Sequence, residues 1–94
     1  GRRFKAGIMY SPTREADAER IKEKLNDLGF EVNMLNITHL SHSRFVANKN
    51  AVTVEFYTDY LGKKIPEIQN MQFLYDPTEN FSVGSDFTIV LAEQ

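Results

Sequence analysis

His39 and His42, the two histidines of the chain, lie three residues apart and are the first candidates for chemistry. On a helix this spacing would place both imidazoles on one side, where they could share a metal ion. A metal site needs a third ligand, and no aspartate or glutamate lies near them in the sequence. We therefore predict no metal site and expect both histidines in a solvated loop.

Ser41 and Ser43 flank His42, and serine and histidine are the residue types of a nucleophile and its general base. Catalytic partners normally converge from separate segments and require an oxyanion hole, so adjacency in the sequence is weak evidence for such a pair. The chain also lacks a G-x-S-x-G elbow, a G-x-G-x-x-G pattern, a P-loop and cysteine. The sequence therefore predicts no catalytic residues, no cofactor and a chain that is not an enzyme.

Two polar stretches are the expected binding regions, namely residues 38–48 and the Pro- and Gly-bearing residues 76–85. Binding residues gather on loops that a rigid sheet holds in place. Tyrosines near strand ends add contact area together with a hydroxyl group, which suits recognition of a glycan or a peptide. The predicted binding surface consists of His39, His42, Arg44, Tyr57, Tyr60 and Tyr75.

The composition is that of one globular domain, which we expect to span residues 1–94. The chain has 94 residues, of which 41% are hydrophobic and 26% are charged, and its formal net charge is −2. A nucleic-acid-binding domain normally has a basic patch, so we predict no nucleic-acid partner. No apolar run is long enough to cross a bilayer, so this segment is not expected to insert into a membrane.

The elements that must position these residues begin with a strand over residues 4–10, where apolar and other residues alternate. Ser11 is expected to cap a helix that begins at Pro12, because a serine oxygen accepts bonds from first-turn amides. Ala18, Ile21, Leu25 and Leu28 form the apolar stripe of this helix. Gly29 follows the stripe and is expected to end the helix in the left-handed conformation.

The rest of the chain alternates strands with a second helix. We expect a strand over residues 30–37 that is buried on both faces or bulged, then a loop over residues 38–50 and a strand over residues 51–57. Thr58 or Asp59 should cap a second helix that Pro66 interrupts. Residues 71–75 and 86–91 are the last two strands. The predicted fold is an α/β (α+β) two-layer sandwich, β-α-β-β-α-β-β, with two helices on a mixed sheet.

Three stretches resemble the LytR C-terminal domain family across nearly the whole chain. They are Ala6-Gly7-Ile8-Met9-Tyr10-Ser11 with the helix ending in Leu28-Gly29-Phe30-Glu31-Val32, then Val52–Tyr57, then Asp86–Leu91. The chain departs from the family pattern at Ala92, where a glycine commonly follows the last strand, and at Pro66 in the second helix. The first half is also similar to the start of a TIR or receiver domain.

The resemblance implies a bacterial, extracytoplasmic accessory domain that is appended to a membrane-anchored envelope protein and is not its catalytic part. Its expected partners are cell-wall polymer or an envelope protein, and it carries over no catalytic or ligand-binding residues. The abrupt start at Gly1 and the end at Gln94 lead us to expect a domain excised from a longer chain that holds the anchor. The alternative is a cytoplasmic protein–protein interaction module.

Overall fold

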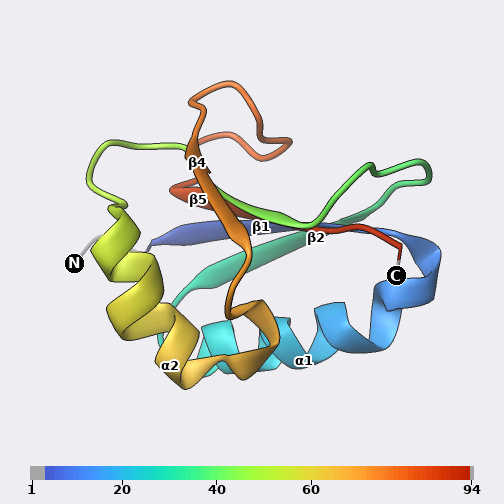
Figure 1. Ribbon diagram of the computed structural model, residues 1–94, viewed down its shortest axis with the longest axis horizontal. Coiled ribbons are helices and arrows are strands. Elements are labelled where there is room, and N and C mark those ends of the chain that lie inside the picture. Colours follow the sequence, from blue (N-terminus) through green and yellow to red (C-terminus); the bar gives the residue numbers. More distant parts are fainter. Residues whose placement is uncertain (1–3, 94) are drawn as a thin grey trace.

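The computed structural model describes residues 4–93, so residues 1–3 and 94 of the predicted domain lie outside the described part. Five strands form one mixed sheet in the order β2-β1-β5-β3-β4, and two helical segments cover one of its faces (Figure 1). The predicted order of elements and the predicted two-layer α+β fold are therefore confirmed. Among the described residues, none of the helices combines the length and the apolar character that crossing a membrane requires.

The first half of the fold is a strand-helix-strand unit. It contains β1 (Lys5–Tyr10), the 3-10 turn η1 (Pro12–Arg14), α1 (Glu15–Asp27) and β2 (Glu31–Asn36). The apolar stripe of α1 is buried as predicted, through Ala18, Ile21 and Leu25. Gly29 has a φ of 97°, which ends the helix in the expected left-handed conformation. The predicted cap is wrong, because Ser11 makes no side-chain hydrogen bond to the first turn.

The expectation that the second strand is buried on both faces or bulged is wrong. β2 is an edge strand that pairs in parallel with β1 in unbroken register, with Ile8 opposite Met34 and Met9 opposite Leu35. Met34 packs against the core, whereas the side chain of Leu35 is 38% exposed on the other face. The apolar residues of both parities thus reflect one core face and one partly open face.

The middle of the chain differs from the prediction. β3 is Arg44–Ala47, inside the predicted loop, whereas the predicted strand over residues 51–57 is a turn followed by a helical segment at residues 54–64. The core of this segment is a π-helix, η2 (Phe56–Leu61), which continues as α2 (Gly62–Lys64). Val54 is 42% exposed, while the central residues of β3 are fully buried, so burial decides which apolar run becomes the strand.

The predicted caps of the second helix, Thr58 and Asp59, lie inside the π-helix. The hydroxyl oxygen of Thr53 instead accepts a 3.1 Å hydrogen bond from the backbone N–H of Phe56, at the start of the segment. The break predicted at Pro66 is confirmed. The helix ends at Lys64, and Pro66 begins the short 3-10 turn η3 (Pro66–Ile68).

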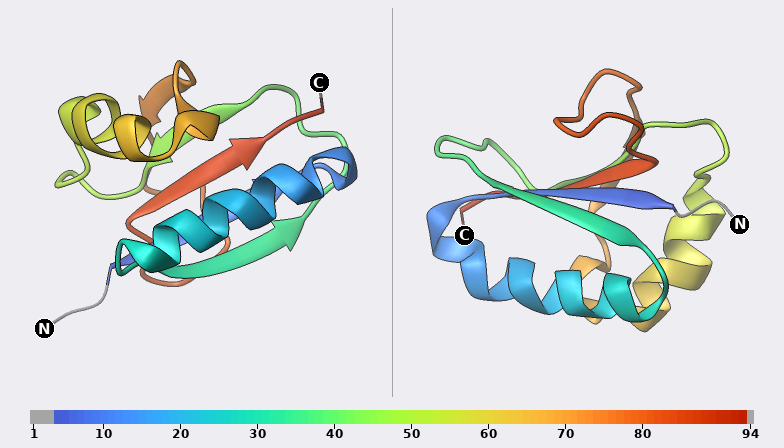
Figure 2. Two further views of the ribbon diagram at one scale, coloured as in Figure 1. Left: turned by 90° about the horizontal axis from the view of Figure 1, so that it is seen from below. Right: turned by 180° about the vertical axis from the view of Figure 1, so that it is seen from behind.

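The second half repeats the strand-helix-strand arrangement of the first. β3 pairs in parallel with β4 (Gln72–Tyr75), just as β1 pairs with β2. β5 (Phe87–Leu91) lies between the halves, parallel to β1 and antiparallel to β3. Both helical segments lie on the same face of the sheet (Figure 2). A receiver domain differs, because it has helices on both faces of a parallel sheet.

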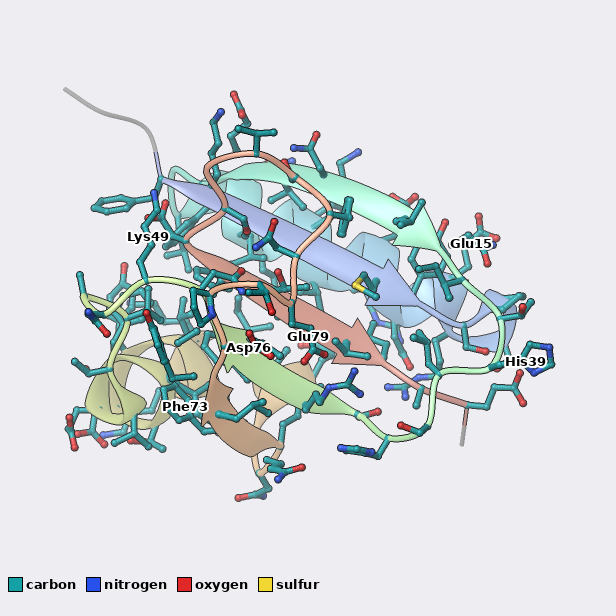
Figure 3. All side chains as sticks on the ribbon, turned by 90° about the horizontal axis from the view of Figure 1, so that it is seen from above. Glu15, His39, Lys49, Phe73, Asp76 and Glu79 are labelled. Atoms are coloured by element: carbon teal, nitrogen blue, oxygen red, sulfur yellow. The ribbon has the colours of Figure 1, made fainter. Side chains whose placement is uncertain are left out.

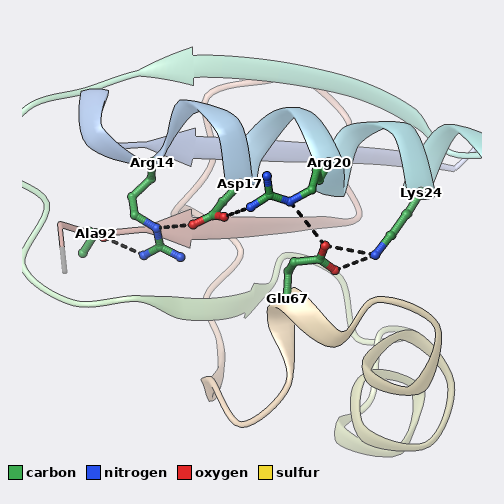
Figure 4. Close-up of polar contacts among 6 residues, drawn as sticks. All are labelled: Arg14, Asp17, Arg20, Lys24, Glu67 and Ala92. Atoms are coloured by element: carbon green, nitrogen blue, oxygen red, sulfur yellow. Dashed lines mark hydrogen bonds and ion pairs between the residues drawn. The ribbon is translucent and has the colours of Figure 1, made fainter.

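Ion pairs tie the two helical regions together across their outer surfaces (Figure 4). The ammonium nitrogen of Lys24 on α1 lies 2.8 Å from a carboxylate oxygen of Glu67 on η3, and Arg20 lies 3.7 Å from the other oxygen. Asp17 pairs with Arg20 and, at 2.8 Å, with Arg14. These contacts hold η3 against α1.

Candidate functional site

A pocket of about 370 Å³ opens where the end of α1, the start of β5 and the helical segment 54–64 meet. We call it the aromatic pocket, because five of its ten lining residues carry aromatic rings. The lining residues are Phe4, Leu28, Gly29, Phe30, Ala51, Val52, Phe56, Tyr60, Asp86 and Phe87. They come from segments far apart in the sequence, which the sheet and the two helical regions bring to one place.

Phe30 and Phe87 form the buried part of the pocket. Phe87 begins the central strand β5 and is fully buried, and Phe30 follows the glycine that ends α1. The two ring centroids lie 5.3 Å apart in an edge-to-face arrangement, which is a favoured geometry for aromatic pairs. Phe56 packs on both, at 6.4 Å from Phe30 and 6.3 Å from Phe87. The wall is therefore fixed by ring–ring contacts.

Phe4 and Tyr60 line the pocket but remain open to solvent, with 55% and 39% of their surfaces exposed. The Phe4 ring lies 6.0 Å from Phe30, and the Tyr60 ring stacks on Phe56 at 5.5 Å. The ammonium group of Lys64 lies 5.3 Å from the centroid of the Tyr60 ring. These two exposed rings are the part of the lining that a bound molecule would cover.

The π-helix determines which side chains face the pocket. Its hydrogen bonds join residues five apart, as in the bond from the Gly62 N–H to the Tyr57 carbonyl. Phe56 and Tyr60 both point to the pocket, while Tyr57 points into the core. π-helical turns are often found at functional sites, which agrees with the location of this one in the pocket wall.

Asp86 is the one carboxylate among the lining residues that the structure describes. It is buried, and one carboxylate oxygen accepts a 2.8 Å hydrogen bond from the backbone N–H of Lys5. The other oxygen lies 3.3 Å from the ammonium group of Lys49. Its own N–H donates to the Lys5 carbonyl at 2.8 Å, so Asp86 joins the starts of β1 and β5. The carboxylate is thus held by protein donors at the edge of the pocket.

The loop over residues 76–85 lies on the face of the sheet opposite the helices (Figure 3). The side-chain amide of Asn48 donates to the backbone carbonyls of Asp76, at 2.8 Å, and of Glu79, at 3.0 Å. The hydroxyl and backbone N–H of Thr78 both donate to the Asp76 carboxylate, and these bonds lower the pKa of Asp76. This predicted binding loop is therefore fixed to the sheet by the Asn48 side chain and stabilised internally by the bonds between Thr78 and Asp76.

Three residues of the predicted binding surface, His39, His42 and Arg44, belong to the first predicted loop, and two of them are in contact. His39 and His42 are exposed, and the backbone carbonyl of His42 accepts a 2.7 Å bond from Arg44. The Arg44 guanidinium also donates to the Glu79 carboxylate at 2.7 Å, which links the two loops. Across residues 4–93, no group of three or more histidine, aspartate or glutamate side chains is placed to hold a metal ion.

The three predicted tyrosines occupy three different environments. Tyr57 is only 3% exposed and belongs to the core, so it does not contribute to a surface. Tyr75 is 49% exposed on the edge strand β4. Tyr60 is the one predicted residue that lines the aromatic pocket.

The four phenylalanines of the pocket are not among the residues predicted from the sequence for the binding surface. Each was assigned to a strand, and alternation alone does not show that Phe4, Phe30, Phe56 and Phe87 meet at one end of the sheet. One usable signal was present, since Val52, Phe56 and Tyr60 recur every four residues. In a helix that spacing places Phe56 and Tyr60 on one side, and both line the pocket together with Val52, which lies in the turn before the helical segment.

The fold and the pocket together define a small α+β domain with an apolar, aromatic cavity. No protein-family model matches the chain, and comparisons with curated proteins and with solved structures found no match either.

Proposed function

We propose that this chain is a non-catalytic accessory domain of a bacterial cell-envelope protein, and that it binds cell-wall polymer or an envelope protein at the aromatic pocket. The envelope setting, outside the cytoplasm, comes from the resemblance to the LytR C-terminal domain family. The binding role rests on one observation, the pocket itself, in which buried rings form the wall and two exposed rings remain to be covered.

The size and chemistry of the pocket support a binding role. Sites for small ligands and side chains commonly have volumes of about 300–1,000 Å³ and apolar, aromatic walls with few polar groups. The aromatic pocket, at about 370 Å³, lies within this range. Apolar rings that remain exposed in a folded domain gain free energy when a partner covers them, at about 25 cal/mol per Å² of buried apolar area. Phe4 and Tyr60 both have exposed aromatic surface that a partner could bury.

The polar groups of the pocket support binding more than chemistry. A general acid or base must be within hydrogen-bond reach of a substrate proton. The Asp86 carboxylate instead accepts a backbone hydrogen bond and pairs with Lys49, so its role is to hold two strand ends together. This arrangement makes the pocket a preformed surface.

The test is an NMR titration of the ¹⁵N-labelled domain with soluble peptidoglycan fragments, with assigned backbone amides as the readout. Saturable shifts at Gly29, Phe30 and Val52 support wall-polymer binding at the pocket. The variant Tyr60→Ser should weaken them, and the matched control Tyr75→Ser, on the far edge of the sheet, should leave them unchanged. Saturable shifts confined to other surfaces refute the pocket as the site, and a flat response leaves an envelope protein as the partner.

The envelope setting has its own test in the full-length host protein. Protease added to intact spheroplasts should cleave a domain that lies outside the cytoplasmic membrane, and a cytoplasmic marker protein should stay intact in the same sample. Full protection of the domain until the membrane is lysed would overturn the envelope assignment and favour a cytoplasmic protein-interaction module.

A further inference from the structure

We propose that the group that enters the aromatic pocket is an apolar side chain, aromatic or branched aliphatic, on a peptide segment of a protein partner. The side chain is flanked by an acidic residue. This inference rests on the proposed function, since it takes the pocket as the binding site and chooses between wall polymer and protein. Three properties of the pocket support this proposal. They are hydrogen-bonding groups that already have partners, two exposed aromatic rings, and a positively charged ammonium group beside one of those rings.

The first property is that three backbone N–H groups around the pocket already have partners within the chain. The N–H groups of Gly29 and Phe30 donate to the carbonyls of Asn26 and Leu25, both at 3.0 Å. The N–H of Val52 donates to Lys49 at 3.0 Å. These amides are therefore unavailable to an incoming ligand.

Two further polar groups of the pocket, the backbone N–H of Phe56 and the Asp86 carboxylate, also have partners. The N–H of Phe56 is bound by the Thr53 hydroxyl, and both carboxylate oxygens of Asp86 have protein partners. A sugar ring carries several hydroxyl groups, and each one that is buried without a partner weakens binding. An apolar side chain carries no hydroxyl groups, so it loses no hydrogen bonds to water when the pocket buries it. The pocket therefore favours an apolar side chain over a saccharide.

The second property is the arrangement of the rings. Phe30 and Phe87 form a rigid buried wall, while Phe4 and Tyr60 are exposed beside it. A side chain inserted between them would contact aromatic surface on several sides and cover the two exposed rings. Most of the binding energy of a protein interface comes from a few such anchor side chains in preformed, desolvated pockets. The rings thus fit an anchor residue.

The third property is a positive charge next to the exposed ring of Tyr60. The ammonium group of Lys64 lies 5.3 Å from the Tyr60 centroid, and no ion pair joins it to a carboxylate in residues 4–93. An acidic residue beside the anchor would meet this ammonium group when the anchor is bound. Opposite charges around an apolar anchor guide association and fix the orientation of a partner.

The experiment uses four small probes in the same amide-shift assay: N-acetyl-phenylalaninamide, N-acetyl-leucinamide, N-acetyl-serinamide and tri-N-acetylchitotriose. We expect the phenylalanine and leucine amides to shift the amides of Gly29, Phe30 and Val52 saturably. They should bind at least about tenfold more tightly than the serine amide, because the pocket removes their apolar surface from water. Tyr60→Ser should weaken this binding, and Tyr75→Ser should not.

The charge is tested with acetyl-Asp-Phe-amide and acetyl-Lys-Phe-amide. We expect the acidic dipeptide to bind about twofold to fivefold more tightly, the range of an exposed ion pair, and the preference to fall as salt is added. Lys64→Glu should abolish the preference, while the neighbouring variant Lys63→Glu should keep it. An unchanged preference in Lys64→Glu would overturn the acidic flanking residue.

Two outcomes separate failure of the ligand class from failure of the binding site. If the chitotriose shifts the pocket amides and the apolar amides do not, the pocket is a saccharide site, the side-chain proposal is wrong and the proposed function stands. If no probe shifts the pocket amides up to its solubility limit, and peptidoglycan fragments do not either, the pocket is not a binding site and both proposals fall.

Discussion

The hydroxyl group of Thr88 donates a 2.8 Å hydrogen bond to the side-chain oxygen of Asn48, and both residues are buried. The amide nitrogen of the same asparagine donates to two carbonyls of the loop over residues 76–85. One side chain, placed directly after β3, therefore links the central strand β5 to the loop that covers the second face of the sheet. Removal of a buried group with this many partners is therefore expected to lower the stability of the fold substantially.

The variant Asn48→Ala should lower the free energy of unfolding by about 2–3 kcal/mol, because it leaves the Thr88 hydroxyl and two carbonyls without partners. Urea unfolding followed by circular dichroism measures the change, and amide exchange should show faster opening of residues 76–85. Asn50→Ala, at an exposed position two residues along, is the control and should stay within about 0.5 kcal/mol of the parent. Equal effects of both variants would contradict the role of Asn48.

Tyr57 supplies the second prediction, because its hydroxyl group joins two segments inside the core. It donates to the Ile68 carbonyl and accepts a 2.7 Å hydrogen bond from the Met71 N–H. Tyr57→Phe should cost about 1–3 kcal/mol, since the N–H and the carbonyl lose their partner while packing is kept. Thermal unfolding measures this loss. Tyr60→Phe, at an exposed ring, should have little effect.

The pH dependence of stability should carry the signature of the same tyrosine. Burial raises the pKa of Tyr57, and the hydrogen bond from Met71 acts in the opposite direction with a smaller effect. The folded state thus holds the proton more tightly than the unfolded state, so this contribution is complete below pH 10 and is lost as the pH rises further. Urea midpoints measured between pH 8 and pH 11 should fall less steeply in Tyr57→Phe than in the parent. Parallel curves would contradict the assignment.

The elements that could be predicted from the sequence have a pattern with one structural solution. Helix α1 has an apolar stripe and a glycine after its end, although it begins at Glu15 and the predicted start at Pro12 is the 3-10 turn η1, and β5 is a continuous β-prone run. In these segments local preference and burial agree, which is the condition under which sequence patterns are reliable. The order of elements and the two-layer α+β fold were predicted from the sequence, whereas the order of the strands in the sheet, β2-β1-β5-β3-β4, was not.

The middle of the chain could not be predicted because two periods overlap there. Val52, Val54 and Phe56 alternate as in a strand, whereas Val52, Phe56 and Tyr60 repeat as on a helix. The short apolar run Phe45-Val46-Ala47 is surrounded by polar residues, and only tertiary pairing with β5 and β4 makes it a strand. The pocket was missed for the same reason, because its rings meet through tertiary contacts.

Glu67 supplies the fourth prediction, through its contacts with α1. The hydrogen bond from Lys24 is the main cause that lowers the pKa of Glu67, and the positive charges of Lys24 and Arg20 act in the same direction. The contribution to stability is therefore present above the unfolded pKa of about 4.3 and is lost as the pH falls through the lower folded pKa. Glu67→Gln should cost about 1 kcal/mol or less at pH 7, because the pair is partly exposed.

The same variant should lose its disadvantage in acid, where the parent glutamate is also neutral. Urea midpoints of Glu67→Gln and of the parent should differ at pH 7 and converge near pH 3. Glu19→Gln, at an exposed position on the outer side of α1, should differ little from the parent at pH 7. A difference between Glu67→Gln and the parent that is constant across this range would show that lost packing, and not the charge, explains the effect.

Ser11 carries the last prediction, because the sequence and the structure give it opposite roles. As a helix cap, it would stabilise the fold, and Ser11→Ala would cost about 0.5–2 kcal/mol. In the structure its side-chain oxygen is buried and has no hydrogen-bond partner among residues 4–93. Replacing an unpaired buried hydroxyl group with a hydrogen atom removes a desolvation cost, so Ser11→Ala should leave stability unchanged or raise it by about 1 kcal/mol.

The matched control is Ser85→Ala, since Ser85 is also buried but donates a 2.8 Å hydrogen bond to the Phe87 carbonyl. Its removal should cost about 1 kcal/mol, the usual worth of such a bond. Thermal and urea unfolding of the two variants, measured side by side, should therefore move in opposite directions or differ clearly in size. A loss in Ser11→Ala as large as that in Ser85→Ala would mean that Ser11 caps the helix in solution, as its sequence pattern predicts.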